Sequence, residues 1–487
     1  MVMKCSILAW ACAVAVVGRA LGAQPDPTSD MNSLELQGRF IDAASSIDLT
    51  LRDAHLPPEE RARLEFERDR LMRIRLDFPF TRETLFSNLQ AVVRGLTRQE
   101  FERWVTEARF DSRLIEGELR FMSSSVANLF FRYPELDPRR QPPRNTAPLA
   151  RQRWETCIAI RNAAHAEKQP YVLPKRFHAT MAVTVQADTV PAADVIRAWL
   201  PIPRRYPFQQ RFELLSTSSP VRHLADESSP IRSLYLEQPA QKGKPCVFTA
   251  EYDYTAYGVC FDLNPASIHD CDPQDPSLSP FLKESPHVAF TPEMRALSQE
   301  ILGAECNPTL KAKKCFDWIA DHIQYSYAVE YSTIRNISDY CRSRRYGDCG
   351  QEALLFITLC RLNGIPARWQ SGWNTFPGEN TIHDWSEIYL APYGWIPVDP
   401  YMGIFAMRYA AGLSMDQRTL IRDFHFGGLD QYRMVANSDH NQTLDPPKQT
   451  FRSDTVDFQR GELEAAGRNI YFDRYSYSLK INELSAP

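Results

Sequence analysis

Three residues in the last third of the chain could together perform nucleophilic chemistry: Cys349, His383 and Asp399. Cys349 opens a segment typical of a helix, about 349–363, which Gly364 should end. Free backbone N–H groups and the positive end of the helix dipole favour a thiolate at such a position. The sequence therefore predicts a nucleophilic cysteine at the N-terminus of a helix.

Three segments typical of strands follow that helix, at 367–373, 385–390 and 395–398. His383 lies at the mouth of the second segment, and Asp399 ends the third. A histidine there could take the thiol proton and later protonate the leaving group, while the aspartate would orient the imidazole and stabilise its charged form. The order of these elements predicts a Cys-His-Asp triad.

The residues around these positions resemble the transglutaminase-like superfamily. The chain reads Gly-Asp-Cys-Gly at 347–350, His-Asp-Trp-Ser-Glu-Ile-Tyr at 383–389 and Gly-Trp-Ile-Pro-Val-Asp-Pro at 394–400. The three motifs follow the family's order with similar spacing, and the resemblance covers roughly 285–405. It implies a papain/transglutaminase-like α+β core in which the cysteine, histidine and aspartate of these motifs are catalytic.

The chemistry that the resemblance implies is thiol acyl transfer at amide bonds. The thiolate attacks an amide carbonyl, an amine or ammonia leaves, and a thioester remains. Water as the acceptor makes the enzyme a peptidase or amidase, whereas an amine makes it a protein cross-linking transglutaminase. We expect hydrolysis, because cross-linking needs a cleft that excludes water and admits a lysine amine, and the sequence shows no sign of one.

Two alternatives remain open. A non-catalytic binding protein could use the same core, although an intact triad argues against that. An enzyme that cleaves glycan-linked amides is also compatible, and a deep aromatic groove near Cys349 would favour it. The expected partner is a protein, peptide or peptidoglycan-like substrate.

Other parts of the site are less defined by the sequence. The resemblance implies that a backbone N–H near the cysteine and an upstream aromatic or amide group bind the oxyanion. The N–H of Cys349 is a candidate, and Gln324, Tyr325 and Tyr327 lie upstream without a signal that chooses among them. The nearby tryptophans are expected in the core, and one of them, Trp373, could also line the cleft.

The segments that must position the triad form an α+β multidomain arrangement. Helical periodicity comes first, alternation typical of strands follows a Pro-rich stretch, and helices return before the triad. The expected units are a helical domain at 30–132, a Pro-rich linker with a short helix at 133–175, a β-sandwich-like domain at 176–263, a linker at 264–290, a transglutaminase-like core at 291–440 and a C-terminal extension at 441–487.

Composition is that of a folded protein without a bias toward a nucleic-acid partner. Of 487 residues, 44% are hydrophobic and 24% are charged. Lysine and arginine number 56 against 60 acidic residues, so the net charge is −4 and there is no basic excess. We expect no nucleic acid among the partners and no stable membrane insertion.

The first 23 residues are typical of a secretory signal peptide. Lys4 supplies the positive start, 7–17 is an apolar run, and 20–23 offers small residues for cleavage. This predicts a secreted or periplasmic protein. Of the 11 cysteines, Cys5 and Cys12 lie in the signal, and the odd remainder suggests one thiol with its own role if the others pair.

No metal or cofactor is expected. The sequence contains no C-x-x-C pair, so zinc binding is not indicated. Asp270, Asp272 and Asp275 lie in the second linker, but the spacing and terminal glutamate of an EF-hand are missing. We therefore expect activity without calcium, unlike the animal cross-linking enzymes of the superfamily.

Overall fold

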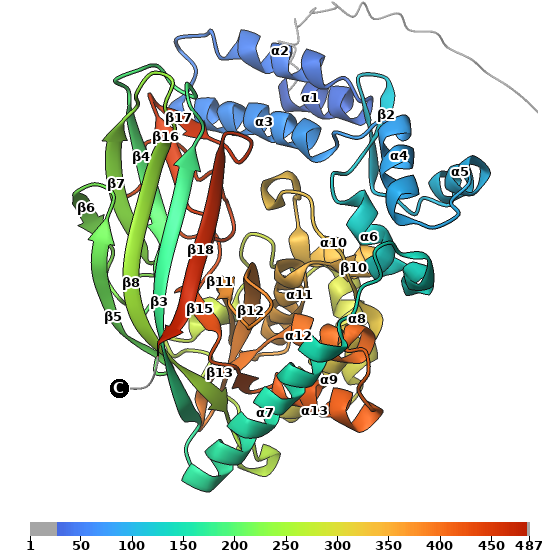
Figure 1. Cartoon of the computed structure of the whole chain (residues 1–487), viewed down its shortest axis with the longest axis vertical. Helices are drawn as coiled ribbons and strands as arrows, with labels where there is room; N and C mark the ends of the chain where they lie inside the picture. Colours follow the sequence, from blue (N-terminus) through green and yellow to red (C-terminus); the bar gives the residue numbers. More distant parts are fainter. Residues whose placement is uncertain (1–26, 485–487) are drawn as a thin grey trace, which may run out of the picture.

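The computed structural model describes residues 27–484. The predicted signal peptide at 1–23, with Cys5 and Cys12, lies outside these residues. Figure 1 shows a lobe of antiparallel β-strands on the left, a helical lobe that runs across the top and down the right side, and a mixed core below it. This is the α+β multidomain architecture that the sequence predicted.

The N-terminal lobe is helical but contains one hairpin that the sequence did not reveal. Its turn uses Glu116 and Gly117, both with positive φ, a conformation that glycine adopts without strain. The elements are α1 (Pro27–Leu36), α2 (Phe40–Thr50), α3 (Pro58–Asp77), α4 (Arg82–Val92), α5 (Arg98–Thr106), β1 (Ser112–Ile115), β2 (Glu118–Phe121) and α6 (Ser125–Arg132).

Helix α5 shows how local sequence sets these boundaries. The Thr97 hydroxyl accepts a hydrogen bond from the Glu100 backbone N–H at 3.2 Å, which caps the helix start. Phe101 and Trp104, one turn apart, are both buried in the core of this lobe. A polar cap and an apolar face together define this helix within the region that the sequence predicted to be helical.

The stretch between the first two lobes contains a longer helix than expected. A short 3₁₀ segment (Pro134–Arg139) is followed by α7 (Ala147–Glu167), which runs along the foot of the molecule in Figure 1. Arg153 on α7 is buried and pairs with Glu379 and Asp430 of the core. Helix α7 therefore belongs structurally to the core and is not part of a linker.

The β-lobe consists of two five-stranded antiparallel sheets whose inner faces share one apolar core, a β-sandwich. The first sheet has the order β14 (Gly428–Leu429), β8 (Cys246–Cys260), β3 (Tyr171–Val185), β18 (Tyr475–Leu484), with β5 (Gln209–Thr217) also on β8. The second has the order β17 (Arg468–Ile470), β16 (Glu462–Ala465), β4 (Val195–Pro201), β7 (Ser233–Pro239), β6 (Val221–Leu224).

The end of the chain completes both sheets of this sandwich. Strand β18 pairs with β3 from Tyr475↔Val185 to Leu484↔Arg176, and β16 pairs with β4. The segment that the sequence suggested as an extension, 441–487, therefore contributes three strands to the β-lobe within its described residues. Strands β16 and β17 are short, and all three lie so far from 176–263 that the sequence gives no signal of their partners.

The core packs helices against a four-stranded antiparallel sheet. The sheet order is β13 (Gly394–Val398), β12 (Thr381–Leu390), β11 (Ala367–Asn374), β15 (Arg433–Asn437). The helices are α8 (Pro292–Leu302), α9 (Pro308–His322), α10 (Ile337–Arg344), α11 (Cys349–Leu362), α12 (Pro400–Ile404) and α13 (Met415–Phe424), with a parallel pair of β9 (Gln324–Tyr325) and β10 (Tyr346–Gly347).

Helix α11 is the centre of the core. Its residues from Cys349 to Arg361 are all buried, and it packs against α9, α10, β11 and β12. The two buried tryptophans Trp369 and Trp385 lie on the neighbouring strands, as expected for core residues. Most of this helix is apolar, and its polar residues, such as Glu352 and Arg361, are buried as well, as expected for a helix enclosed by the rest of the fold.

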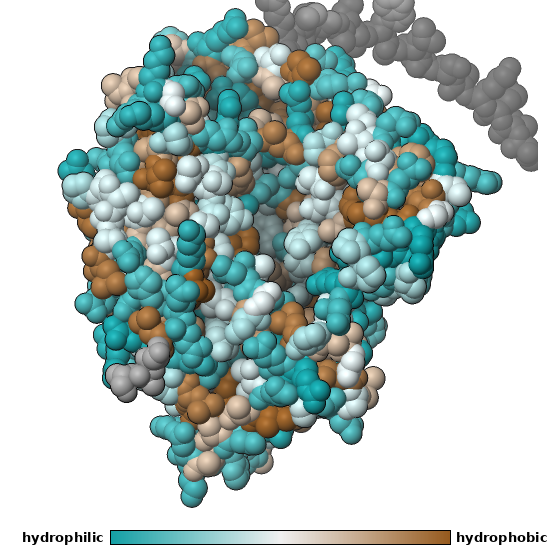
Figure 2. All heavy atoms as spheres, in the orientation of Figure 1, coloured by the Kyte–Doolittle hydropathy of each residue, from teal (hydrophilic) through white to brown (hydrophobic). Residues whose placement is uncertain are grey.

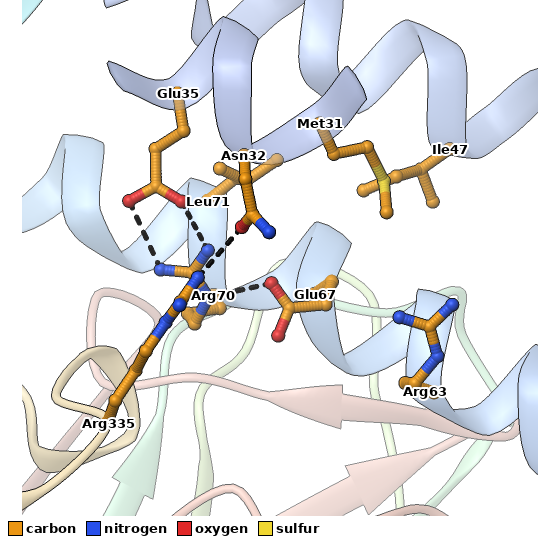
Figure 3. Close-up of a pocket in the computed structure, with 9 residues that line it drawn as sticks. All are labelled: Met31, Asn32, Glu35, Ile47, Arg63, Glu67, Arg70, Leu71 and Arg335. Carbon is orange, nitrogen blue, oxygen red and sulfur yellow. Dashed lines mark hydrogen bonds and ion pairs between the residues drawn. The ribbon is translucent and has the colours of Figure 1, made fainter. Parts of the chain in front are cut away.

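A polar pocket joins the first helices to the core (Figure 3). Glu35 on α1 faces Arg70 on α3, and Arg335 from the core donates a hydrogen bond to Asn32 at 2.8 Å. Arg113 from β1 also pairs with Glu35. The pocket has a volume of about 260 Å³ and is lined largely by charged side chains. Several of these form ion pairs that connect different helices and strands.

Candidate active site

Cys349 is the first residue of α11, as the sequence predicted. Asp348 precedes it as the cap: its carboxylate accepts the Gln351 N–H at 3.1 Å, while the Gln351 side-chain oxygen accepts the Asp348 N–H at 3.3 Å. The next position, Gly350, has no room for a side chain, because a Cβ there would lie 2.1 Å from the Tyr331 hydroxyl oxygen. These contacts fix the thiol at the start of the helix.

The thiol itself is not in the state that the helix dipole alone would favour. Cys349 is 9% exposed, and its Sγ donates a hydrogen bond to Asp384 Oδ2 at 3.6 Å. Burial, followed by the charges of Asp384 and Asp348, raises the pKa of the thiol well above its usual range. Burial and the acidic neighbours therefore oppose the effect of the helix dipole that the sequence suggested for this thiol.

His383 and Asp399 are paired. His383 Nε2 lies 2.8 Å from Asp399 Oδ2, and both side chains are buried. His383 lies inside β12 and not at its mouth, and Asp399 follows β13 and caps α12 by accepting the Met402 N–H at 3.2 Å. Since Nε2 is used by Asp399, Nδ1 is the imidazole nitrogen left for another partner.

Two rings hold the imidazole in place. The Trp385 ring stacks on His383 with centroids 5.6 Å apart, and the Tyr401 ring meets it edge-on at 5.4 Å. Burial lowers the pKa of His383, Asp399 opposes this effect, and Arg433 adds to the lowering. The resting site therefore pairs a neutral thiol with a neutral imidazole.

Arg433 is a member of the site that the sequence did not indicate. Its Nη2 lies 3.1 Å from Asp399 Oδ2, with both side chains fully buried, and its Nε lies 3.4 Å from Asp430. Burial alone would raise the pKa of Asp399, but His383 and Arg433 outweigh it and hold that pKa well below its usual range. Arg433 thus keeps the carboxylate ionised beside the imidazole.

Asp384 and Gln459 form a second buried layer against the triad. The Gln459 amide nitrogen donates to Asp384 Oδ1 at 2.7 Å and to the His383 carbonyl at 2.8 Å. Burial and the charge of Asp348 raise the pKa of Asp384 well above its usual range. Asp384 was visible in the sequence as the neighbour of His383, whereas nothing marked Gln459, which arrives from the loop before β16.

Cys349 and His383 line one large cleft between the lobes. The cleft has a volume of about 990 Å³, and Figure 2 shows the surface hollowed between the β-lobe and the helical lobe. Phe131 comes from α6 and Tyr477 from β18, so both lobes form its walls. Its aromatic lining is Phe131, Tyr325, Tyr327, Tyr331, Trp373, Tyr401 and Tyr477.

Only some of the upstream residues that the sequence suggested for binding the oxyanion lie on the cleft. Tyr325 and Tyr327 both border the cleft, and Trp373 borders it from β11. Gln324 instead pairs with Tyr346 between β9 and β10. The cleft therefore contains two of the three upstream candidates, together with Tyr331.

The cleft loop at 326–332 is held by side chains of the helical lobe. Asn128 on α6 makes two hydrogen bonds to the Tyr327 backbone, at 3.0 and 2.8 Å. Arg132 donates to the Ser326 hydroxyl, and Asp77 accepts the Glu330 N–H at 2.9 Å. The helical lobe therefore positions one wall of the cleft.

The other predicted features of the chain are located as follows. Within residues 27–484, no cluster of three or more potential metal ligands occurs, and no helix has the length and apolar character needed to cross a membrane. All nine cysteines of that range are free thiols, so the odd number of cysteines does not single out one unpaired thiol among disulfides. The acids Asp272 and Asp275 accept hydrogen bonds from the N–H groups of Gln274 and Ser277 in their own turns.

Comparison with known proteins identifies related sequences of limited extent. An uncharacterized protein of Haemophilus influenzae is 26% identical over 161 residues, which cover 28% of this chain and 43% of that protein. The uncharacterized protein YebA of Bacillus subtilis is 27% identical over 131 residues, which cover 23% of this chain and 17% of that protein. This chain therefore spans less than half the length of either relative.

Solved structures of related shape have low identity. A candidate cysteine protease from Cytophaga hutchinsonii is 15% identical, with 65% of this chain and 93% of that chain covered and a TM-score of 0.41. The periplasmic domain of TgpA from Pseudomonas aeruginosa is 16% identical, with 49% and 91% covered and a TM-score of 0.27. Residues 295–400 match the family model of the transglutaminase-like superfamily. That segment, which holds Cys349, His383 and Asp399, is a core of the transglutaminase-like superfamily.

Proposed function

We propose that this protein is a secreted or periplasmic thiol hydrolase that cleaves amide bonds, a peptidase or amidase, with Cys349 as nucleophile. The observation that carries the proposal is the placement of Cys349 at the start of α11, on the same cleft as a His383–Asp399 pair at 2.8 Å. The signal-like segment at 1–23 is the reason for the proposed location.

The reaction starts from neutral groups. His383 Nδ1 accepts the thiol proton as Cys349 Sγ attacks the amide carbonyl, and Asp399 stabilises the imidazolium. The backbone N–H of Cys349 is our candidate for binding the oxyanion. The imidazolium then protonates the departing amine, and a thioester remains on Sγ.

The second half returns the enzyme to its starting state. His383 removes a proton from a water molecule as its oxygen attacks the thioester carbonyl. The C–S bond breaks, the thiol is re-protonated by the imidazolium, and a carboxylic acid leaves. Asp384 accepts the resting thiol's hydrogen bond at 3.6 Å, so the thiol proton must change partner before attack.

Hydrolysis is favoured over amine transfer by the shape and lining of the cleft. A volume of about 990 Å³ leaves ample room for water beside a substrate, and the exposed residues Asn380 and Thr381 give polar groups to its lining. Cross-linking requires exclusion of water from the thioester, which such an opening does not favour.

Cleavage of glycan-linked amides is a second candidate, and the aromatic lining of the cleft favours it. Tyr325, Tyr331 and Trp373 lie on the same cleft as Cys349, together with further rings from both lobes. Aromatic faces pack well against flat, partly apolar ligands. Parallel assays with peptide amides and with glycan-linked amides distinguish the two substrate classes.

The proposal is tested by incubating the protein with a glutamine-containing protein and a fluorescent primary amine. We expect peptide cleavage or ammonia release to exceed amine incorporation, and Cys349→Ala to abolish all three. Cys306→Ala is the matched control, because Cys306 is an exposed thiol away from the cleft. Amine incorporation that dominates would assign transfer, and turnover that survives Cys349→Ala would refute the nucleophile.

A further inference from the structure

A second pocket continues the cleft into the helical lobe. It has a volume of about 680 Å³ and shares Ser124, Tyr327 and Arg144 with the cleft that holds Cys349. Arg140 borders it as well, and no acidic residue is among the described residues that line it. A substrate that fills the cleft can therefore extend into a pocket whose charged groups are two arginines.

Both guanidinium groups lie over aromatic rings of α6. Arg140 lies 4.6 Å from the centroid of Phe130, and Arg144 lies 5.4 Å from that of Phe131. Burial and then the charge of Arg144 lower the pKa of Arg140, so the two cations are close enough to repel each other. Such repulsion is relieved when an anion binds between like charges.

Neither guanidinium forms an ion pair with a carboxylate within residues 27–484; Asp137 acts on Arg140 only through its longer-range charge. Of the other charged groups along the cleft, Asp348, Asp384 and Asp457 are acids without an ion-pair partner among the described residues, and burial raises the pKa of each. Two further acids and one arginine of the lining are in ion pairs. Arg460 contacts Glu330 and Asp454, each at 3.1 Å, and Glu379 pairs with Arg153. The two arginines are therefore an unneutralised positive site beside the cleft, in a chain whose net charge is −4.

The backbone around Arg140 is fixed. The Gln141 N–H donates to the Val92 carbonyl at 2.8 Å, and the Arg94 N–H donates to the Arg139 carbonyl at 2.8 Å. Arg139 itself pairs with Glu100 and so is not available to a ligand. These bonds anchor Arg140, which lowers the entropic cost of binding. Arg144 lies in the exposed stretch that follows, and the next anchor is the Thr146 hydroxyl, which donates to the Tyr409 carbonyl at 3.1 Å.

We propose that Arg140 and Arg144 form a carboxylate-binding subsite that selects acidic peptides for the cleft. The planar guanidinium matches a carboxylate with two parallel hydrogen bonds, and the neighbouring rings accept the apolar part of a peptide. This inference rests on the proposed function, because it assigns the substrate class of the same site. The carboxylate can belong to an acidic side chain or to a free C-terminus.

Binding to the Cys349→Ala protein tests the subsite without requiring turnover. Fluorescent peptides are compared in matched pairs, with Glu against Gln and with a free against an amidated C-terminus, by anisotropy. We expect at least about tenfold tighter binding of the carboxylate form in one pair, from two charged hydrogen bonds. That pair identifies which carboxylate is recognised.

Variants of Arg144, the arginine that borders both pockets, then test its part in the selectivity. Arg144→Gln should remove most of the preference and leave the neutral peptide unaffected, whereas Arg144→Glu should reverse it. Arg151→Gln is the matched control, because Arg151 is an exposed arginine of α7 outside both pockets. Equal affinity for acidic and neutral peptides, including no binding of either, would overturn the subsite.

The two proposals fail in distinguishable ways. Selective binding of acidic peptides by a chain that turns over no amide would refute the hydrolase and leave the subsite intact. Turnover that depends on Cys349 but is indifferent to peptide charge would refute the subsite alone.

Discussion

Arg433 determines how the His383–Asp399 pair responds to pH. Its charge helps to keep Asp399 ionised and lowers the pKa of His383, which burial already lowers. Only neutral imidazole can accept the thiol proton, so activity is lost as the pH falls through the pKa of His383. Because that pKa is lowered, the acid limb of kcat/KM should lie below the ordinary histidine value of 6.5.

Replacing Arg433 should shift the acid limb of the pH profile of kcat/KM. In Arg433→Gln the neighbouring cation is gone, so the pKa of His383 rises and the acid limb of kcat/KM shifts to higher pH. Arg433→Lys keeps the charge and is the matched control, with the limb near its original position. A limb that stays in place in Arg433→Gln, with the protein folded, would contradict this role. The pH profile is decisive because a purely structural role changes activity but not the limb.

Thiol reactivity should follow exposure in the resting protein. Cys306 is exposed, whereas Cys349 is buried and burial raises the pKa of its thiol. We expect iodoacetamide at pH 7 to modify Cys306 first, by mass spectrometry of tryptic peptides, because the thiolate is the reactive form. A peptide-based electrophile that enters the cleft should instead select Cys349. Rapid iodoacetamide labelling of Cys349 in Cys306→Ser would show a resting thiolate.

Among individual residues, the sequence predicted those that lie in the motifs and missed the residues that contact and orient them. Cys349, His383 and Asp399 are recognisable because each lies in a short contiguous motif. Arg433 reaches Asp399 only because β15 pairs with β11, and such long-range pairing leaves no local pattern. The roles of the three motif residues remain a prediction until they are tested by substitution.

Helix starts were the most readable elements. Helix α11 begins at Cys349, as the sequence predicted, with Asp348 as its cap. Asn307 and Thr291 likewise cap α9 and α8. Strand β16 was hidden because it has only four residues, Glu-Leu-Glu-Ala. Its Leu463 and Ala465 face the sandwich core, whereas Glu462 and Glu464 are buried on the other face, where the segment 448–453 supplies their partners.

Glu462 should therefore contribute strongly to stability. It pairs with Lys448 and Arg452, and these outweigh burial and lower its pKa from 4.5 to about 2. We expect Glu462→Gln to reduce the free energy of unfolding at pH 7 by about 3–5 kcal/mol, since two buried cations lose their partner. Urea denaturation measures this loss.

The pH dependence of that effect has a defined sign. A lowered pKa in the folded state stabilises the protein above 4.5, and the contribution disappears as the pH falls toward 2. The gap between the wild-type protein and Glu462→Gln should narrow over that range. Glu483→Gln is the control, because the Lys175–Glu483 pair is partly exposed and is worth at most about 1 kcal/mol. Equal losses for both variants would refute the assignment.

At the scale of the whole molecule, the three lobes share the cleft. Phe131 comes from the helical lobe, Tyr477 from the last strand of the sandwich and Cys349 from the core. Sequence periodicity separated these regions into helices and strands but could not place them around a common cleft, because their contacts join residues hundreds of positions apart. The helical lobe therefore forms part of the wall of this cleft.

Asn128 offers the sharpest test of that arrangement. Its side chain makes both hydrogen bonds to the Tyr327 backbone, so Asn128→Ala should free the cleft loop at 326–332. We expect faster hydrogen exchange in that loop and a higher KM, with a stability loss of about 2 kcal/mol for two hydrogen bonds. Thr97→Ala removes a helix cap in the same lobe and serves as the control, because it costs about 1 kcal/mol without contact to the loop. Equal effects of the two variants on KM and on loop exchange would mean that the helical lobe stabilises the fold without shaping the site.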